Sequence, residues 1–439
     1  MEDMKKRAQS LIDFIGKCPS PFHVIKMTAD SLAAAGFTEL SETKSWQLEK
    51  GGKYFIRRAG SSLIAFCLPD GDFSAFQLIA SHTDSPVFKV KESPEMASEG
   101  LVTLNVEKYG GMLISPWFDR PLSVAGRVCV RTAEGVESRL VNIDRDLLML
   151  PSLAIHMDRQ ANEGHAYKVQ KEIRPIFGEE EAKGRFRELI AEAAGCSSED
   201  LISQDLILYS RTPGRLWGAD EEFFSAPRID DLMCVYASTQ AFLDSRTGSA
   251  VKALCLFDNE EVGSLTKQGA SSMFLSDTLR RISLFCGKGE EEHMAAVNAG
   301  FMISADNGHA VHPNYPEKAD PTNRPVMNGG VLIKYNAAQK YTTDAVSAGI
   351  FKEICRREEI PEQTYVNHSD VPGGSTLGNL SNAHVSLNTI DIGAAQLAMH
   401  SPYETAGVRD VTYLYRAMKA FFESRIKKDK DNYIIRAIK

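Results

Sequence analysis

Residues 251–264, VKALCLFDNEEVGS, join a largely apolar run to a cluster of acids. The run 251–257 has the length and composition of a buried strand, and open α/β sheets collect their ligands at the carboxyl ends of such strands. Glu260 and Glu261 would project in different directions there, so one carboxylate could bind a metal while its neighbour moves protons. The same acids are also typical of a polar exit from a strand into a loop. Ligands elsewhere in the chain must decide between the two interpretations.

Composition limits the class of protein. The chain has 439 residues, 43% hydrophobic and 25% charged, which is longer than a usual single domain, so we expect two domains. A net charge of −8 without a long run of Lys and Arg argues against nucleic acid as the main partner. The sequence shows no secretory signal and no membrane span. The eight cysteines are dispersed, without a Cys-x-x-Cys, which is typical of reduced residues in the cytoplasm.

Helix and strand patterns alternate in two separate parts of the chain. Before residue 90, strand patterns follow a helical region, and the last strand, 76–80, ends at Ser81-His82-Thr83-Asp84. After residue 220, helices at 231–243 and 411–427 alternate with strands at 251–257, 295–303, 329–334 and 384–390. The segment from about 91 to 217 is rich in short strands and turns, with one helix at 180–194. These patterns predict an α/β protein that carries a β-rich insertion.

Five segments place histidines or carboxylates beside a predicted strand end or helix start. Ligands at the carboxyl ends of separate strands converge on one crevice of a parallel sheet. Two histidines and three carboxylates are the ligand mix expected for zinc or a similar divalent ion. Five ligands are too many for one tetrahedral zinc, but with one bridging carboxylate they give two ions three protein contacts each. The candidate ligands are His82, Asp230, Glu261, Asp306 and His400.

Each candidate also has a simple structural explanation when it is taken alone. A single histidine such as His82 is often a hydrogen-bonded structural residue. Asp230 precedes a helical pattern and would serve as its N-cap, with Asp231 as the better cap if Asp230 turns toward a metal. His400 is followed by Ser401-Pro402, which would mark an ordinary loop. Only the combination of the five segments favours a metal site.

Eight short motifs span most of the chain in order: Ser81-His82-Thr83-Asp84-Ser85-Pro86, Tyr109-Gly110-Gly111, Trp117-Phe118-Asp119-Arg120, Pro227-Arg228-Ile229-Asp230, Asp258 to Ser264, Ser304-Ala305-Asp306, His309 to Tyr315 and Met399-His400-Ser401. In these motifs the chain resembles the aspartyl aminopeptidase family of metallopeptidases. This resemblance implies a discontinuous α/β catalytic domain, residues 1–89 and 220–439, with a mostly parallel sheet flanked by helices. A β-rich dimerisation domain at 90–219 would interrupt it.

The resemblance also assigns the metal ligands. It implies that His82 and Asp306 hold one zinc, that Glu261 and His400 hold the other, and that Asp230 bridges the two ions. Cobalt or manganese could occupy the same sites.

Four further residues receive roles from the resemblance. Glu260 looks like the general base, and Asp84 looks like the residue that orients His82. Family members form large tetrahedral homo-oligomers, so we expect a homo-dodecamer built from dimers, in which His156 reaches the active site of a neighbouring subunit. Lys334 is similar to the family lysine near the first side chain of the substrate. A buried or interface histidine and a strand-edge lysine explain His156 and Lys334 equally simply.

The predicted activity is that of a metal-dependent aminopeptidase acting on peptides with a free N-terminus, with Asp or Glu as the candidate first residue. Asp231 stands where the family commonly has asparagine, and the segment after His400 differs from the aspartyl branch, so this preference stays open. A dinuclear deacylase or a carboxypeptidase would use the same ligands. A non-catalytic scaffold of the same fold is the alternative from another class, although a scaffold needs neither a base nor five ligands.

Overall fold

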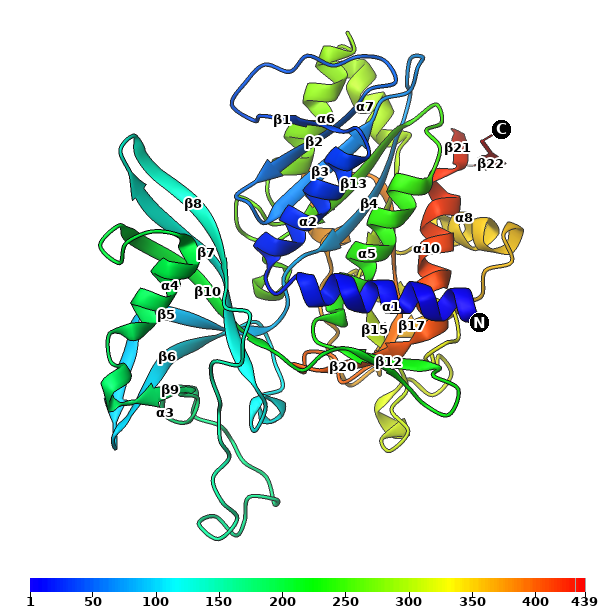
Figure 1. The fold of residues 1–439 in the computed structure, drawn as a ribbon. Coiled ribbons are helices and arrows are strands. Elements are labelled where there is room, and N and C mark those ends of the chain that lie inside the picture. The colour runs from blue at the N-terminus through cyan, green and yellow to red at the C-terminus, as the bar shows by residue number, and fades with distance from the viewer. Residues whose placement is uncertain (431, 439) are drawn as a thin grey trace.

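Nine strands form the main sheet in the order β1-β2-β3-β13-β4-β14-β18-β16-β17. The computed structural model, shown in Figure 1, describes residues 1–430 and 432–438. Five of the eight strand pairings are parallel, which confirms the predicted α/β fold with a mostly parallel sheet. The strands are β1 Thr38–Leu40, β2 Lys53–Arg58, β3 Ser62–Cys67, β4 Phe76–His82, β13 Val251–Phe257, β14 Phe301–Ala305, β16 Val331–Tyr335, β17 Glu362–Val366 and β18 Asn388–Gly393.

A second sheet of six antiparallel strands, β8-β7-β10-β5-β6-β9, stands beside the first at the left of Figure 1. Its strands come from residues 87 to 210, so they fall almost entirely within the predicted insertion, and β5 begins at Val87. The boundaries of the two domains stay a prediction. The strands are β5 Val87–Ser98, β6 Leu101–Tyr109, β7 Leu122–Thr132, β8 Gly135–Asn142, β9 Ile176–Glu179 and β10 Leu201–Ser210.

A third sheet, β11-β12-β20-β19-β15, lies below the main sheet in Figure 1, and a separate hairpin, β21-β22, follows the last helix. The third sheet is important for the site because it pairs β12 with β20, two strands that are far apart in the sequence. The strands are β11 Arg215–Trp217, β12 Phe223–Ala226, β15 Gly308–His309, β19 Ala395–Leu397, β20 Glu404–Gly407, β21 Ser424–Asp429 and β22 Asn432–Ala437.

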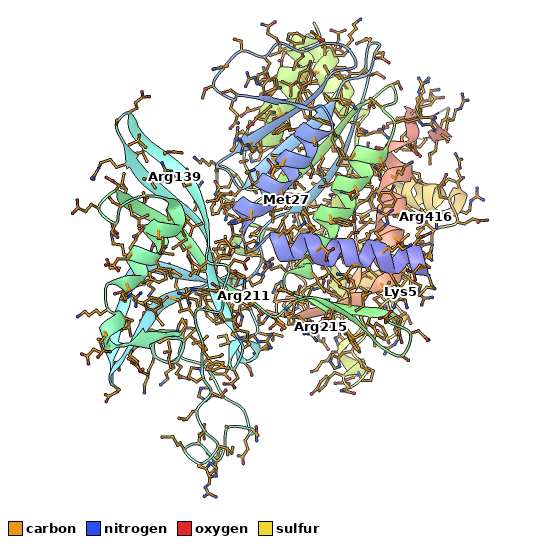
Figure 2. The ribbon with its side chains drawn as sticks, in the orientation of Figure 1. Lys5, Met27, Arg139, Arg211, Arg215 and Arg416 are labelled. Atoms are coloured by element: carbon orange, nitrogen blue, oxygen red, sulfur yellow. The ribbon has the colours of Figure 1, made fainter. Side chains whose placement is uncertain are left out.

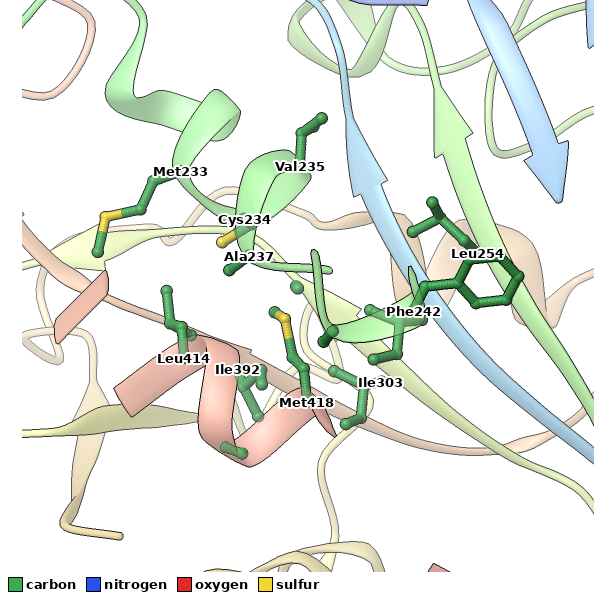
Figure 3. Packing of buried hydrophobic residues seen from close by; sticks show 14 of the residues in the cluster. Met233, Cys234, Val235, Ala237, Phe242, Leu254, Ile303, Ile392, Leu414 and Met418 are labelled. Atoms are coloured by element: carbon green, nitrogen blue, oxygen red, sulfur yellow. The ribbon is translucent and has the colours of Figure 1, made fainter. Parts of the chain in front are cut away.

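Helices cover both faces of the main sheet. Side chains of α1, α2, α5, α8 and α10 form one core with one face, and side chains of α6, α7 and α9 form another with the opposite face. In Figure 3, residues of α5 and α10 meet Leu254, Ile303 and Ile392 from three strands. The helices are α1 Glu2–Lys17, α2 Pro21–Ala34, α3 Val169–Glu172, α4 Arg185–Ala194, α5 Ile229–Asp244, α6 Phe274–Phe285, α7 Glu290–Asn298, α8 Ala345–Arg357, α9 Leu377–Asn382 and α10 Val408–Phe422.

Strand β13 is buried along its whole length because it contributes to both cores. Leu254 and Leu256 pack on one face, while Ala253, Cys255 and Phe257 pack on the other, as the two-residue period of a strand requires. The charged Lys252 is accommodated because its Nζ donates to the carbonyl oxygens of Phe242 and Ser245, at 2.9 and 2.7 Å, at the end of α5. A lysine at the carboxyl end of a helix satisfies orphan carbonyl groups there.

Four predicted elements have wrong boundaries. The predicted strand 295–303 begins only at Phe301, because Ala295 and Ala296, good helix formers, complete α7. The predicted strand 384–390 begins at Asn388. The predicted helix 180–194 begins at Arg185, after Gly184 with a positive φ of 91°. The predicted helix 411–427 ends at Phe422, and the chain continues as β21. The sequence pattern therefore located these elements but missed their ends by several residues.

A long loop, residues 143–168, projects from the six-stranded sheet between β8 and α3 (Figure 1). Arg211, labelled in Figure 2, forms ion pairs with Asp144 and Asp146 and so ties down the first residues of the loop. Among residues 1–430 and 432–438, no helix combines the length and the apolar composition that a membrane crossing needs.

Candidate metal centre

Three neighbouring parallel strands, β13, β4 and β14, bring three of the predicted segments to one edge of the main sheet. His82 is the last residue of β4 and lies opposite Phe257, the last residue of β13. Glu260 and Glu261 follow β13 in a short 3₁₀ turn, η3 (Glu260–Val262), and Asp306 follows β14 directly. The strand order therefore places the imidazole and the carboxylates at the end of the sheet where ligands bind in α/β proteins.

The other two predicted ligands come from the third sheet. Asp230 stands four residues after β12, at the start of α5, and His400 lies in the loop between β19 and β20. Strands β12 and β20 pair with Ala226 opposite Glu404. This pairing brings Asp230, which follows β12, close to His400, which precedes β20. All five predicted ligands thus meet at one place.

The Asp230 carboxylate lies between the two histidines. Its Oδ1 is 3.4 Å from His82 Nε2, and its Oδ2 is 3.4 Å from His400 Nε2. His82 Nε2 is also 3.7 Å from Asp306 Oδ1, and His400 Nε2 is 3.5 Å from Glu261 Oε1. The residues therefore form two groups of donor atoms that share Asp230, and each group has the composition of a metal site.

These separations fit shared cations better than direct hydrogen bonds. They exceed the usual 2.7–3.2 Å of an N–H···O bond. Two ligands about 2.05 Å from a tetrahedral zinc lie about 3.3 Å from each other. Among the described residues, Asp230 Oδ1 and Glu261 Oε1 are buried without a hydrogen-bond partner. Buried carboxylate oxygens without partners are costly unless a cation compensates them, so the donor set fits divalent metal ions.

Burial and the nearby charges shift the pKa values of His82 and Glu260. Burial would lower the pKa of His82, but Asp231, Asp230 and Asp306 outweigh it and raise that pKa well above its ordinary value. Burial raises the pKa of Glu260 to about 8, with Asp306 and Asp84 adding to the effect and His82 opposing it. A cation at the centre would act against both shifts, because it favours carboxylates and neutral imidazoles.

Asp84 contacts the site in two ways. Its backbone carbonyl oxygen lies 3.1 Å from His82 Nδ1, which is the orienting contact predicted for this residue, although it comes from the main chain. The carboxylate Oδ1 lies 3.5 Å from the same nitrogen. This carboxylate also accepts hydrogen bonds from the turn: Oδ1 accepts the N–H of Glu260 and Oδ2 accepts the N–H of Glu261, both at 3.1 Å. Asp84 therefore fixes the turn that carries the two glutamates.

Two further acids support the ligands and were missed by sequence reasoning. Glu404 is 1% exposed, and its two oxygens accept the N–H groups of Asp230, at 2.9 Å, and of His400, at 2.7 Å. Asp231 is not a helix cap; its Oδ2 accepts the N–H of His82 at 3.1 Å. The only sequence signal for Glu404 is an acid close after His400, and its significance depends on the pairing of β12 with β20.

The ammonium group of Lys334, in β16, contacts Asp306 and Asn307. Its Nζ donates to the backbone oxygens of Asp306 and Asn307, each at 2.8 Å, and to Asp306 Oδ2 at 3.2 Å. The side chain is buried, and these three acceptors match the three N–H groups of an ammonium. This contact set differs from the expected role at the first side chain of a substrate.

His156 lies apart from the other predicted residues within the chain. It is exposed on the loop 143–168, which projects from the six-stranded sheet in Figure 1, and it belongs to none of the possible metal-binding groups among the described residues. The structure of one chain therefore does not bring His156 to the ligands.

A cavity of about 420 Å³ is lined by residues close in sequence to two of the predicted ligands, although none of the five ligands lines it. His309, three residues after Asp306, and Ala398, two residues before His400, contribute to its wall. Tyr341 also lines it, and the Nζ of Lys334 lies 5.1 Å from the centroid of that ring. A substrate side chain could therefore enter this cavity while the reacting bond lies at the metal centre.

Comparison with known proteins gives consistent matches over nearly the whole chain. The family described as "Aminopeptidase I zinc metalloprotease (M18)" matches residues 14–422. A probable M18 family aminopeptidase 2 of Clostridium acetobutylicum is 44% identical over 431 residues, which cover 96% of this chain and 100% of that protein. The corresponding protein of Clostridium novyi is 41% identical over 432 residues, with the same coverage.

Solved structures share the fold. A cryo-EM structure of an Ape4 and Nbr1 complex contains a chain with a TM-score of 0.93 and 34% identity, covering 96% of this chain and 86% of that one. The crystal structure of prApe1 gives a TM-score of 0.90 with 29% identity, covering 95% and 94%. The mApe1 dodecamer of S. cerevisiae gives 0.84 with 28% identity, covering 96% and 97%.

Proposed function

The chain belongs to the aminopeptidase I zinc metalloprotease (M18) family, and on that premise we propose that five residues hold two divalent cations at its metal centre. His82 and Asp306 serve one cation, Glu261 and His400 serve the other, and Asp230 is shared. The family membership confirms the predicted resemblance and makes the protein a zinc metallo-aminopeptidase. The number of ions and the assignment of each ligand belong to the proposal.

The observation that carries this proposal is the position of Asp230. Its two carboxylate oxygens face different histidines at equal distances of 3.4 Å, and its Oδ1 has no hydrogen-bond partner among the described residues. Zinc suits two imidazoles and three carboxylates, and cobalt or manganese accepts the same donors. When bound, such ions polarise a peptide carbonyl group and acidify a water molecule.

Glu260 acts as the general base in this proposal. Its backbone is held by Asp84, and one of its oxygens lies within 4.8 Å of donor atoms of His82 and Glu261. Glu260 accepts the proton of the water that attacks the first peptide carbonyl, and then passes this proton to the leaving amine. Its neighbour Glu261 is directed toward His400, so the two adjacent acids divide ligation and proton transfer between them.

The substrates in this proposal are peptides with a free N-terminus, with a preference for Asp or Glu as the first residue. The wall of the 420 Å³ cavity supports that preference, since His309, His312, Lys318 and His368 line it. The one acid in the described wall, Asp320, already accepts hydrogen bonds from Thr322 and Asn323. A carboxylate side chain would therefore meet positive or neutral partners in this cavity.

A homo-dodecamer built from dimers is the assembly that we propose. One structural relative is described as a dodecamer. The segment around His156 exposes Leu153 by 60%, Ile155 by 47% and Met157 by 75%, and apolar side chains that gather on a projecting loop are typical of an interface. In this assembly, His156 reaches the active site of a neighbouring subunit.

A cytoplasmic setting also remains a proposal. All eight cysteines are free, five of them buried in the folded chain. Free buried thiols are typical of reducing compartments.

The function is tested with aminoacyl chromogenic substrates of Asp, Glu, Leu, Lys and Ala, assayed with zinc, cobalt and manganese, before and after chelation. We expect cleavage to require a free α-amine, to disappear on chelation and to return with metal, with Asp and Glu preferred. Removal of an N-acyl group or of a C-terminal residue instead would support the deacylase or carboxypeptidase alternative. No bound metal and no cleavage would support the scaffold. A preference for Leu would refute the acidic specificity alone.

A further inference from the structure

The segment that follows β6 connects the six-stranded sheet to the metal centre. Tyr109 ends β6, and residues 109–113 lie against Asp84, Glu261 and His400. The N–H of Leu113 donates to the backbone oxygen of His400 at 3.1 Å. The inserted sheet therefore contacts the metal centre directly, in addition to any role in assembly.

Gly110 packs against one of the proposed ligands. Its φ is +77°, which favours glycine, and a Cβ at this position would lie 3.1 Å from the Cβ of Glu261. The chain passes so close to Glu261 that a larger residue would push the glutamate.

Tyr109 makes the most specific of these contacts. Its hydroxyl donates to Asp84 Oδ2 at 2.7 Å, and it accepts from Asn259 Nδ2 at 2.8 Å. The amide of Asn259 is oriented by its own partners, because its Oδ1 accepts from Thr266 and Gln268, both at 2.9 Å. A phenol has one proton. With a donor on one side, that proton must point to Asp84.

We propose that Tyr109 is a positioning residue for the metal centre, which holds the Asp84 carboxylate and, through it, the turn that carries Glu260 and Glu261. This inference rests on the proposed roles of the two glutamates and adds a residue from the other sheet. The carboxylate of Asp84 accepts from the N–H groups of both glutamates and from Tyr109 Oη. Without the hydroxyl, Asp84 loses its shortest hydrogen bond, and its carboxylate is held mainly by the N–H groups of the two glutamates that it positions. A shift of this carboxylate then moves both glutamates together.

The test is the full-length Tyr109→Phe variant, with Tyr54→Phe as the matched control. Tyr54 is 6% exposed and lies in β2, next to the edge strand β1 of the main sheet. Its hydroxyl accepts one hydrogen bond, from the N–H of Glu49 at 2.8 Å. Measurements are kcat and KM on an aminoacyl substrate, and cobalt affinity in competition with a chromophoric chelator. Loss of a partner behind metal ligands typically reduces activity or metal affinity by 10–100-fold.

For Tyr109→Phe we expect kcat to fall about ten-fold or more with KM within about two-fold, or cobalt affinity to weaken about ten-fold. Tyr54→Phe should leave all three constants unchanged. If Tyr109→Phe does not fold, Asn259→Asp replaces it, because the new carboxylate competes with Asp84 for the Tyr109 proton and should give the same losses.

Unchanged kcat and unchanged cobalt affinity in the folded variant would overturn the inference, even if its thermal stability were lower. A wild-type protein without metal-dependent aminopeptidase activity would instead overturn the proposed function, so the two failures are distinguishable.

Discussion

Replacing Lys334 by methionine separates two roles that the sequence and the structure suggest for this residue. The resemblance places Lys334 at the first side chain of the substrate, whereas its three N–H groups contact Asp306 and Asn307. Methionine keeps most of the buried volume and removes the charge. If Lys334 holds Asp306, the change leaves a carboxylate that is 14% exposed, and two carbonyl groups, without their donor.

The magnitude follows from these contacts. Breaking a buried charge pair by removing one partner costs about 3–5 kcal/mol. If about 3 kcal/mol of this cost raises the energy of the transition state, kcat/KM falls by roughly 100-fold for every substrate, because about 1.4 kcal/mol corresponds to a factor of ten. A lysine that paired with an acidic substrate would instead contribute about 1.5–3 kcal/mol to that substrate alone. Its loss would lower the ratio of Asp to Leu cleavage by roughly 10–150-fold.

The assay is kcat/KM on Asp and Leu substrates together with metal affinity. The matched control is Lys252→Met, because Lys252 is also a buried lysine bound to backbone oxygens, at the opposite end of β13 from the centre. We expect Lys334→Met to weaken metal binding and to lower both kcat/KM values while their ratio stays within about three-fold. Lys252→Met should affect stability alone. A fall of about 10-fold or more in the ratio of Asp to Leu cleavage by Lys334→Met, with unchanged metal affinity, would refute the role of Lys334 in holding Asp306.

Three other changes have expected outcomes. Glu260→Gln should retain metal and lose turnover by about 10²–10⁴-fold, whereas Glu261→Gln should lose metal first; full activity in Glu260→Gln would exclude it as the base. Glu404→Gln leaves only one oxygen to accept the two backbone N–H groups of Asp230 and His400, so metal affinity should fall by about 10–100-fold. The control is Glu353→Gln, a glutamate on the surface of α8. Equal metal affinity in the two variants would contradict this role of Glu404. Burial, with Arg228 adding to it, lowers the pKa of His23 to about 4, so its contribution to stability is present above pH 6.5 and is lost as the pH falls toward 4. This contribution is about 3 kcal/mol, and the melting temperature of the wild type should therefore fall more steeply than that of His23→Gln between pH 6.5 and 4, while parallel curves would argue against the buried neutral imidazole.

The sequence predicts candidate ligands because each belongs to a local pattern. His82, Glu261 and Asp306 lie at or within a few residues of the ends of apolar runs that favour buried strands, and the structure brings all three to the carboxyl ends of neighbouring strands. The strand order β13-β4-β14 is not encoded in any local pattern, however, since β13 lies more than 160 residues after β4 in the sequence. The convergence of the ligands was therefore an inference from the general behaviour of parallel sheets.

The residues behind the ligands could not be predicted in the same way. Glu404 and Asp231 look like ordinary loop and helix-start acids, and each acquires its contact only through long-range pairing. Tyr109 belongs to a segment whose composition indicated an insertion, so nothing local linked it to Asp84. The resemblance placed Lys334 near the first side chain of the substrate, and the sequence could not show that its donors contact Asp306 and Asn307.

The division of labour between Glu260 and Glu261 follows from their common anchor. Asp84 accepts the N–H groups of both residues, so their Cα atoms are fixed relative to His82, whose Nδ1 faces the same residue. From this anchor, Glu261 Oε1 lies 3.5 Å from His400 Nε2, within the group that contains Asp230. Glu260 joins no hydrogen bond through its carboxylate among the described contacts. An acid that is held at its backbone and free at its carboxylate can move a proton between two partners, whereas an acid directed at a histidine and a cation cannot. The geometry of the turn therefore supports the proposed roles, proton transfer for Glu260 and ligation for Glu261.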